Sequence, residues 1–246
     1  GTCDGLNIFD GKDIQIIRAS SSEQTIVGNI IERIYVTQPG TYWIRTNSGL
    51  NKLNYQKGKV LLFPEFAGEN FIFTNQQNNL FVYDKIGYLH IFNEQTEQFQ
   101  SVLFRQSNPI PYQDILSIKF DSKNRLWIYA KQGYYYCFSL HNENTTTPYI
   151  TLLEKQQLKM NITRSFSDGD DECVIDQDQN LYVISNEHSQ TKFIRNVSDL
   201  THFKGAISSI VQYKQDLFIG FRTGGAVKLT YTPDQEEAYT VTDLNI

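Results

Sequence analysis

The sequence has little methionine, few cysteines and no excess of positive charge. Among 246 residues there are one Met and three Cys, and the formal net charge is −5 at pH 7. A nucleic-acid-binding surface would be basic, so this balance argues against nucleic acid as a partner. The odd cysteine count, with no C-x-x-C pair, argues against a disulfide framework. No run approaches the roughly 18 apolar residues that a membrane span needs. Because no signal peptide is present, we expect a cytosolic chain, a processed one or a piece of a longer protein.

Aromatic residues are abundant, and they recur at the centres of short apolar runs. Examples are "LWIYA" and "LYVIS", and the central residues are Trp43, Phe81, Trp127, Tyr182 and Phe218. These anchors are spaced 38, 46, 55 and 36 residues apart. Six residues after the anchors stand Gly49, Gly87, Gly133, His188 and Gly224, and six before them stand Thr37, Asn75, Asp121, Asp176 and Gln212. A period of about 44 residues without a helical stripe predicts blades of four short strands.

We therefore predict an all-β chain, a β-propeller of four-stranded antiparallel blades. The first strand of a blade ends at the polar position, the second carries the anchor, and the glycine turns the chain into the third. A β-sandwich fits the turn signals but not the period, and a β-helix has shorter repeats. About five full blades follow half of a first blade in a single domain, which predicts a piece of a longer protein. The expected blades are 1–31, 32–70, 71–114, 115–171, 172–206 and 207–246, with 157–172 as an inserted loop before the first strand of the fifth blade.

Two stretches, "GTCDGLNIFDG" and "TYWIRTNSGLNKLN", resemble the two-component regulator propeller repeat. Matching positions are Trp43, Ile44, Thr46, Gly49 and Leu50 in the second unit, Asp121, Asn124, Leu126, Trp127, Ile128 and Gly133 in the fourth, and Thr2, Gly5, Leu6, Phe9 and Asp10 in the first. The resemblance implies the periplasmic sensor of a hybrid two-component receptor of polysaccharide-degrading gut bacteria, and it implies that the chain is a fragment of a seven-bladed propeller. Such a receptor is a homodimer with a cytoplasmic histidine kinase, and it senses glycan fragments. This segment would itself make no membrane contact.

Motifs for catalysis are missing, so we predict no catalytic residue, no metal ligand and no cofactor. The sequence contains no phosphate-binding G-x-x-x-x-G-K-[ST], no G-x-S-x-G elbow and no H-E-x-x-H. The acidic stretch 168–172 resembles the start of a calcium loop, but Cys173 stands where the loop needs glycine and Gln179 where it needs glutamate. The aromatic anchors are expected to pack in the core.

Binding residues are expected in the loops, because a propeller's sheets form the scaffold and its loops carry function. The loops between the second and third strands of the blades and the loops between blades should share one rim. That rim would present Arg45, Asn47, Asp84, Lys85, Lys131, Asn186, Glu187, His188, Arg222, Phe66 and Tyr112. Charged and amide groups there could bind sugar hydroxyls, and arginine could bind a uronate or a sulfate. A solvated surface without a ligand is the alternative interpretation.

Three functions remain open at this point. The first is an extracytoplasmic sensor that recognises oligosaccharides from polysaccharide breakdown and signals to a kinase. The second is a propeller scaffold that holds protein partners. The third is a propeller glycosidase or polysaccharide lyase, for which Asp84 and Glu187 would be the paired carboxylates.

Overall fold

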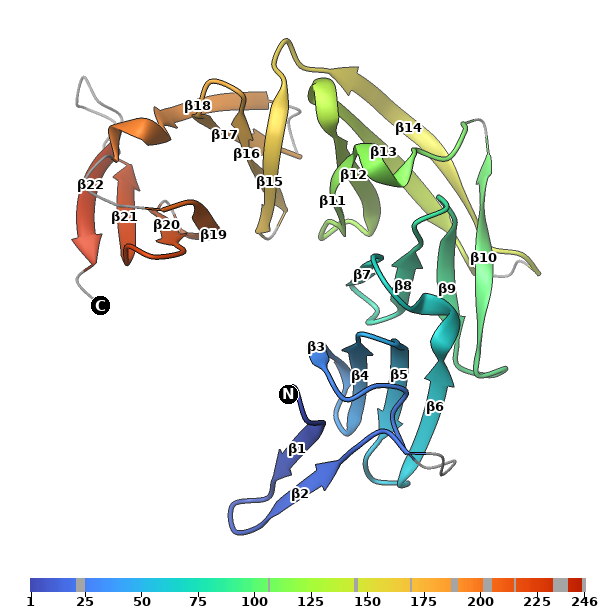
Figure 1. Cartoon of the computed structure of the whole chain (residues 1–246). Helices are drawn as coiled ribbons and strands as arrows, with labels where there is room; N and C mark the ends of the chain where they lie inside the picture. Colours follow the sequence, from blue (N-terminus) through green and yellow to red (C-terminus); the bar gives the residue numbers. More distant parts are fainter. Residues whose placement is uncertain are drawn as a thin grey trace. The chain divides into compact units, whose positions relative to one another are not determined.

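The computed structural model describes residues 1–20, 25–105, 107–143, 146–168, 170–186, 190–200, 205–214, 216–231 and 239–244. These residues form antiparallel strands joined by turns and by short 3-10 helices (Figure 1). In this part of the chain, no helix has the length and apolar character needed to cross a membrane. The chain divides into two compact units. The first contains residues 1–103 and 142–148, and the second contains 104–141 and 149–246.

The first unit holds one two-stranded sheet and the strands of two repeat units. The two-stranded sheet is β1 (Leu6–Phe9) with β2 (Ile14–Ile17). Strands β3 (Ile31–Gln38), β4 (Thr41–Thr46), β5 (Gly49–Asn54) and β6 (Lys59–Phe63) are hydrogen-bonded in chain order as one sheet. Helix η1 (Pro64–Phe66) follows. In another sheet, β7 (Phe71–Thr74), β8 (Leu80–Tyr83), β9 (Leu89–Asn93) and β10 (Gln98–Arg105) are hydrogen-bonded in chain order. The last two residues of β10 belong to the second unit.

The second unit contains three further groups of four strands. The first group is preceded by η2 (Tyr112–Asp114) and has η3 (Lys131–Gly133) in its second turn. Its strands are β11 (Ile115–Phe120), β12 (Arg125–Ala130), β13 (Tyr134–His141) and β14 (Tyr149–Gln157). The second group is β15 (Ile162–Asp168), β16 (Asp171–Asp176), β17 (Asn180–Ser185) and β18 (Gln190–Asn196), followed by η4 (Val197–Asp199). The third is β19 (Ile207–Tyr213), β20 (Asp216–Phe221), β21 (Ala226–Tyr231) and β22 (Tyr239–Leu244). The predicted four-stranded antiparallel blades are confirmed.

Aromatic anchors fill the cores of both units, but not all of them equally. Trp43 is 1% exposed and meets Phe92 edge-to-face at 4.8 Å between ring centroids. Phe81 and Trp127 are buried as well. Tyr182 and Phe218 are only half-buried. The expectation of core packing therefore holds fully for three of the five anchors.

The segment 157–172 departs from its prediction as a loop. Residues Ile162–Asp168 form β15, which pairs with β16 along its length, with Asp168 opposite Asp171. Ile162 is 1% exposed in one core and Phe166 packs on another, although the alternating position between them is the exposed Arg164. A register shift between Ile162 and Arg164 interrupts the alternation along this strand. Strand β16, which ends at Asp176, is consequently the second strand of its sheet and not the first. The expected boundary at 171/172 falls inside this sheet.

A buried carboxylate joins β15 and β16 to the preceding sheet. The Glu172 side chain is fully buried and accepts hydrogen bonds from the hydroxyls of Ser117 on β11 and Ser165 on β15. The Lys119 ammonium lies 3.2 Å from the same carboxylate. A buried charge needs such partners, because an unpaired one would cost several kcal/mol. These contacts place β15 beside β11.

The turns of these two sheets gather at two opposite edges. One edge, called the Gly133 edge, contains 131–133, 158–161 and 177–179, since Leu158 N–H donates to Gly133 O and Gln177 N–H donates to Asn161 O. The other, called the Asp121 edge, contains 121–124, 170–171 and 185–186. There the backbone N–H of Ser122 donates to the Asp170 carboxylate at 2.6 Å.

Candidate ligand-binding groove

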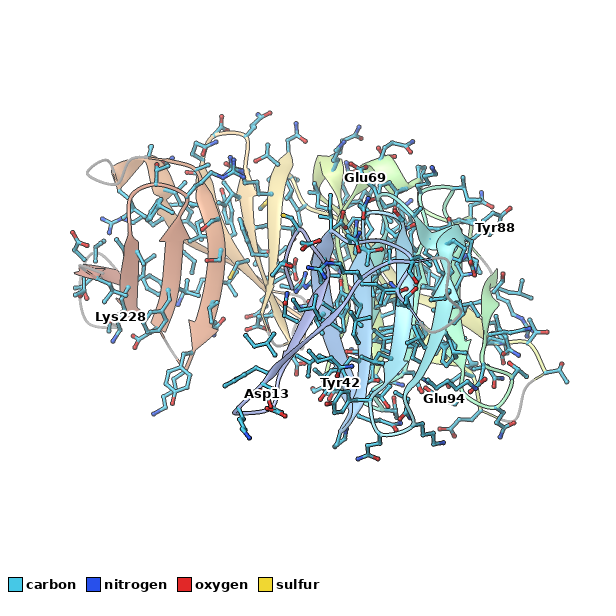
Figure 2. All side chains as sticks on the ribbon, turned by 60° about the horizontal axis from the view of Figure 1, so that its bottom comes forward. Asp13, Tyr42, Glu69, Tyr88, Glu94 and Lys228 are labelled. Carbon is cyan, nitrogen blue, oxygen red and sulfur yellow. The ribbon has the colours of Figure 1, made fainter. Side chains whose placement is uncertain are left out.

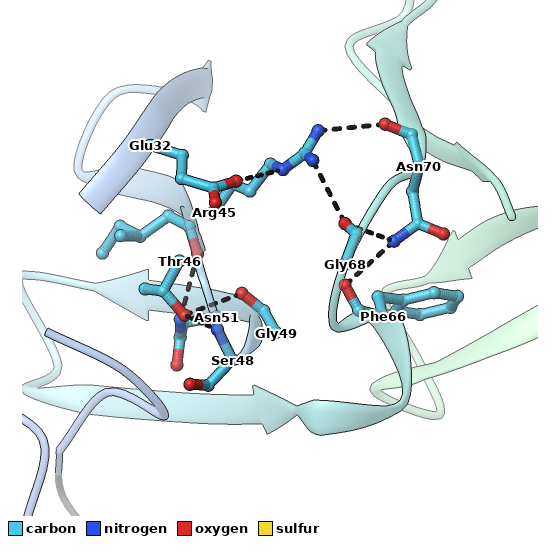
Figure 3. Close-up of polar contacts among 10 residues, drawn as sticks. Glu32, Arg45, Thr46, Ser48, Gly49, Asn51, Phe66, Gly68 and Asn70 are labelled. Atoms are coloured by element: carbon cyan, nitrogen blue, oxygen red, sulfur yellow. Dashed lines mark hydrogen bonds and ion pairs between the residues drawn. The ribbon is translucent and has the colours of Figure 1, made fainter. Parts of the chain in front are cut away.

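In the first unit, Arg45 is committed to contacts within the protein (Figure 3). Its Nη1 donates to the Asn70 carbonyl at 3.0 Å and its Nη2 to the Gly68 carbonyl at 3.1 Å. Its Nε donates to the Glu32 carboxylate at 2.7 Å. The guanidinium thus holds the loop 67–70, on which the exposed Glu69 lies (Figure 2). Its three nitrogens all donate to acceptors of the protein.

Asp84 and Phe66 also have structural roles. The Asp84 Oδ1 accepts the N–H groups of Ile86 and Tyr88 at 3.0 and 2.9 Å, which closes the turn between β8 and β9. Its Oδ2 lies 2.9 Å from His90 Nε2. Phe66 is buried, with its ring centroid 4.7 Å from that of Phe99.

Exposed side chains at this end of the first unit include Asn47, Lys85 and Tyr88, the last of which is labelled in Figure 2. They lie on the turns that the sequence interpretation placed there, between the second and third strands of their repeat units. A groove of this unit is formed by β6, η1 and β10, and none of these three residues lines it.

In the second unit, the predicted residues do not all share one edge. Glu187 and His188 lie outside the described residues. Their neighbour Asn186 is 2% exposed at the Asp121 edge, where its carbonyl accepts from Arg125 at 3.3 Å and its side-chain oxygen from the Tyr129 hydroxyl. Burial, reinforced by the Glu172 charge, raises the pKa of Tyr129 well above its usual range, so the phenol stays a donor. Lys131, in contrast, lies at the Gly133 edge.

The other two predicted residues of this unit lie near turns. Arg222 is exposed in the turn between β20 and β21, and its backbone N–H donates to Ala206 O at 2.9 Å. Tyr112 is half-buried in η2, two positions before a residue that lines the groove described next.

A groove of about 470 Å³ lies beside β13 and β14 and is called the Tyr134 groove. One wall is the segment that leads into η2, and the other is the side-chain row of β13 with the turn at Lys131. Its lining residues are Ser107, Asn108, Pro109, Ile110, Pro111, Asp114, Ala130, Lys131, Gln132, Tyr134, Tyr136, Leu152 and Lys155. A cavity of this size, with aromatic and apolar walls and a few polar groups, has the character of a small-ligand site.

Strand β13 places its tyrosines on the groove by simple alternation. Tyr134, Tyr136 and Phe138 share one face of the strand, whereas Tyr135 and Cys137 face the core behind it. The Tyr134 and Tyr136 ring centroids are 6.4 Å apart with an interplanar angle of 28°. The row continues to Phe138 at 6.3 Å and 14°. Two tyrosines side by side therefore form an aromatic surface with polar hydroxyl ends.

An irregularity in β14 brings a lysine to the same face. Tyr136 lies opposite Lys155 and Phe138 lies opposite Leu152, although these two β14 residues are an odd number of positions apart. The register shift between Cys137 and Phe138 makes this placement possible, because a β-bulge re-aims the side chains that follow it. The Lys155 Nζ lies 5.1 Å from the Tyr134 ring centroid and 5.4 Å from that of Tyr136.

The turn at the mouth of the groove has a fixed shape. Gln132 has φ 60°, Gly133 has φ +77°, and a Cβ on Gly133 would meet the carbonyl oxygens of Leu158 and Met160 at 2.5 Å. Glycine is therefore required by both the backbone conformation and the close approach. Lys131 projects from this turn and is exposed. On the facing wall, the Ser107 hydroxyl oxygen is buried and has no hydrogen-bond partner among the described residues.

Behind the groove, Cys137 is chemically quiet. Burial raises the pKa of the Cys137 thiol to about 12, so it is protonated at neutral pH and a poor nucleophile.

Of the residues predicted from the sequence, Lys131 lines the Tyr134 groove and Tyr112 lies near it. The prediction did not include the lining residues Tyr134, Tyr136, Lys155 and Asp114. The signal for the tyrosines was present in "YYYCF", where alternate positions must face opposite sides of a strand. No sequence signal shows the bulge that turns Lys155 toward them.

Comparisons with known proteins identify the fold. No protein-family model matches the sequence, and no curated protein matches it. An extracellular domain assigned to a hybrid two component system of B. thetaiotaomicron is 17% identical, with a TM-score of 0.59 over 100% of this chain and 33% of its own. A second such domain from the same organism is 15% identical, with a TM-score of 0.57 over 99% of this chain and 41% of its own. The β-propeller domain of Cps50 (Swd1) from Myceliophteria thermophila is 13% identical, with a TM-score of 0.55 over 89% of this chain and 73% of its own.

The fold is a β-propeller. This confirms the predicted fold class. The present chain spans between a third and about two fifths of the length of the two extracellular domains. At these identities the likeness concerns the fold.

Proposed function

We propose that this propeller is the extracytoplasmic, periplasmic sensor region of a hybrid two-component receptor, and that it recognises oligosaccharides in the Tyr134 groove. Two solved propellers that resemble it are extracellular domains assigned to such systems. The parent receptor would be a homodimer that signals to a cytoplasmic histidine kinase. Ligand binding would shift the dimer between two arrangements, which requires a different affinity for each.

The observation that carries the ligand class is the pair of tyrosines that line the groove. A pyranose ring has an apolar face and a polar rim, and a tyrosine surface offers an apolar ring and a polar end in the same arrangement. Asp114 and the Ser107 hydroxyl can bind sugar hydroxyls, because each presents an oxygen to the groove. Aromatic walls with a small number of polar groups fix both the position and the orientation of a ligand.

Enzymatic cleavage of the sugar is a weaker proposal. A glycosidase needs two carboxylates about 5–9 Å apart, and Asp114 is the single carboxylate among the described residues that line the groove. Asp84, one member of the pair considered from the sequence, is engaged by its own turn and by His90.

Isothermal titration calorimetry with a panel of neutral and acidic plant and host oligosaccharides tests the ligand class. We expect selective binding that is weakened at least about tenfold in the double variant Tyr134→Ala, Tyr136→Ala, as for truncation of a central aromatic contact. Tyr213→Ala is the matched control, since Tyr213 is an exposed tyrosine of the same unit with a lysine ammonium 5.4 Å from its ring centroid. Equal weakening by the control variant, or binding by no member of the panel, would contradict the proposal.

The parent architecture has its own test. If the sensor assignment is right, the full-length gene encodes a membrane span followed by a histidine kinase. A gene without a kinase, combined with capture of a defined protein partner, would favour a scaffold instead.

A further inference from the structure

The Tyr134 groove has more positively charged than negatively charged side chains. Lys131 and Lys155 are positive, and Asp114 is negative. Neither lysine has a carboxylate within ion-pair distance among the described residues of the chain. Two other lysines of the second unit, by contrast, are paired: the Lys228 ammonium lies 2.8 Å from the Asp216 carboxylate, and that of Lys119 lies 3.2 Å from the Glu172 carboxylate. Among the described residues, the groove thus presents two cations without a carboxylate counterion.

The position of Lys155 is fixed by the fold. Its ammonium lies near the two tyrosine rings, whose faces attract a cation. The bulge in β14 directs it there, and Lys131 projects from a turn whose glycine cannot be replaced without a clash. Both cations therefore stand on rigid backbone beside the surface on which a sugar ring would pack. A lysine ammonium is a compact point charge, and it suits a carboxylate or a sulfate equally.

We propose that the ligand of the Tyr134 groove is an anionic oligosaccharide, whose acidic group lies between Lys131 and Lys155 while a sugar ring packs on Tyr134 and Tyr136. This inference rests on the proposed function and specifies its ligand class. The acidic group is either the carboxylate of a uronic acid or a sulfate ester, since both would be bound by the same two ammonium groups. Hydroxyls of the same sugar would bind Asp114 and Ser107.

The test compares charged oligosaccharides with uncharged versions of themselves. The first arm uses an oligogalacturonate and its methyl ester, and the second uses a sulfated galactan oligosaccharide and its desulfated form. Titration calorimetry should show at least about tenfold tighter binding of the charged member in one of the arms. This preference should shrink as salt is added, because surface charges are screened. The arm in which the preference occurs identifies the acidic group.

Variants locate the charge recognition. Each of Lys131→Met and Lys155→Met should weaken binding of the charged member about threefold and that of the uncharged member little, as expected for a partly exposed ion pair. Lys214→Met is the matched control, because Lys214 also lies beside an exposed tyrosine ring but outside the groove. Circular dichroism checks that each variant is folded.

The outcomes separate this inference from the function on which it rests. If the uncharged members bind as tightly as the charged ones and the tyrosine double variant abolishes binding, the charge inference is overturned while the oligosaccharide sensor stands. If a charge preference survives both groove substitutions but is lost in Lys214→Met, the anionic site lies elsewhere and the inference is also overturned. If neither charged nor uncharged members bind, both proposals fail.

Discussion

Two turns of the second unit, one at Asp121 and one at Asp176, have the same local structure in different places. The Asp121 Oδ1 accepts the N–H groups two and four positions later at 3.0 and 2.8 Å, and its Oδ2 accepts the Trp127 indole N–H at 2.9 Å. The Asp176 Oδ1 accepts the N–H groups two and four positions later at 2.9 Å each, and its Oδ2 accepts the Tyr182 hydroxyl at 3.2 Å. A short acidic side chain that binds its own following backbone is a common way to close a turn.

The sheets use this turn differently. The Asp121 turn joins the first and second strands of its sheet, β11 and β12, whereas the Asp176 turn joins the second and third strands, β16 and β17. The first position in the latter sheet is occupied by β15. The two turns consequently lie at opposite edges. A repeated sequence motif therefore specifies a hairpin, but the contacts of the flanking strands decide where that hairpin stands in a blade.

The two aspartates also differ in charge partner. The Arg125 guanidinium lies 2.6 Å from the Asp121 carboxylate and 5.3 Å from the centroid of the Trp127 ring. At the equivalent position after Asp176 stands the neutral Asn180, whose amide donates at 3.1 Å. Asp121 is thus part of a buried ion pair, and Asp176 is held by neutral donors.

The largest expected effect comes from removing these carboxylates one at a time. Asp121→Ala should lower the free energy of unfolding by about 2–3 kcal/mol, because it leaves the indole N–H without its acceptor and takes the carboxylate from a partly exposed guanidinium that still donates to the Asn186 carbonyl. Asp176→Ala should cost about 1–2 kcal/mol, because neutral donors are easier to rehydrate. Urea unfolding in a Trp43→Phe background makes Trp127 fluorescence a probe of the second unit. Equal losses for the two variants would show that the arginine adds nothing to the turn.

A smaller loss of stability is expected from removing the side-chain donor that lies six positions after each aspartate. Trp127→Phe removes the indole N–H and some packing volume at a residue 1% exposed, and it should cost about 1–2 kcal/mol. Tyr182→Phe removes only a hydroxyl at a half-buried ring, and about 0.5 kcal/mol is expected. Thermal unfolding followed by circular dichroism measures both. A larger loss for Tyr182→Phe would mean that the Asp176 turn depends more strongly on its ring than the Asp121 turn does.

The comparison also explains which parts of the fold could be predicted. The hairpins were predictable because the polar residue, the anchor and the turn between them are local in sequence, as Asp121 and Trp127 illustrate. The position of β15 was not, since "ITRSFSD" has a weak alternating pattern and the buried Glu172 beside it depends on Ser117, 55 residues earlier in β11. Long-range polar contacts of this kind leave no periodic signal.

Some residues of the candidate site could also be predicted from local sequence, and others could not. Lys131 was predicted because the glycine after the anchor marks its turn. Arg45 and Asp84 occupy predicted turns as well, but their side chains are used by nearby carbonyls, N–H groups and a histidine, which residue type alone does not show. Lys155 reaches the groove only through a register shift, and such a shift follows from packing rather than from local sequence.

The smallest expected effect is the pH dependence of the stability that the Asp121 carboxylate contributes. Burial raises the pKa of this carboxyl, but the Arg125 backbone N–H, the Trp127 indole and the Arg125 guanidinium together outweigh burial and hold the pKa below its usual value of 3.8. A folded-state pKa below the unfolded one stabilises the protein above the unfolded value, and that stabilisation is lost as pH falls through the folded value. The stability difference between the wild type and Asp121→Asn should therefore be constant at neutral pH and narrow below about pH 4. Urea titrations at several pH values measure it, and a difference that stays constant to about pH 2 would mean that ionisation of Asp121 does not stabilise the turn.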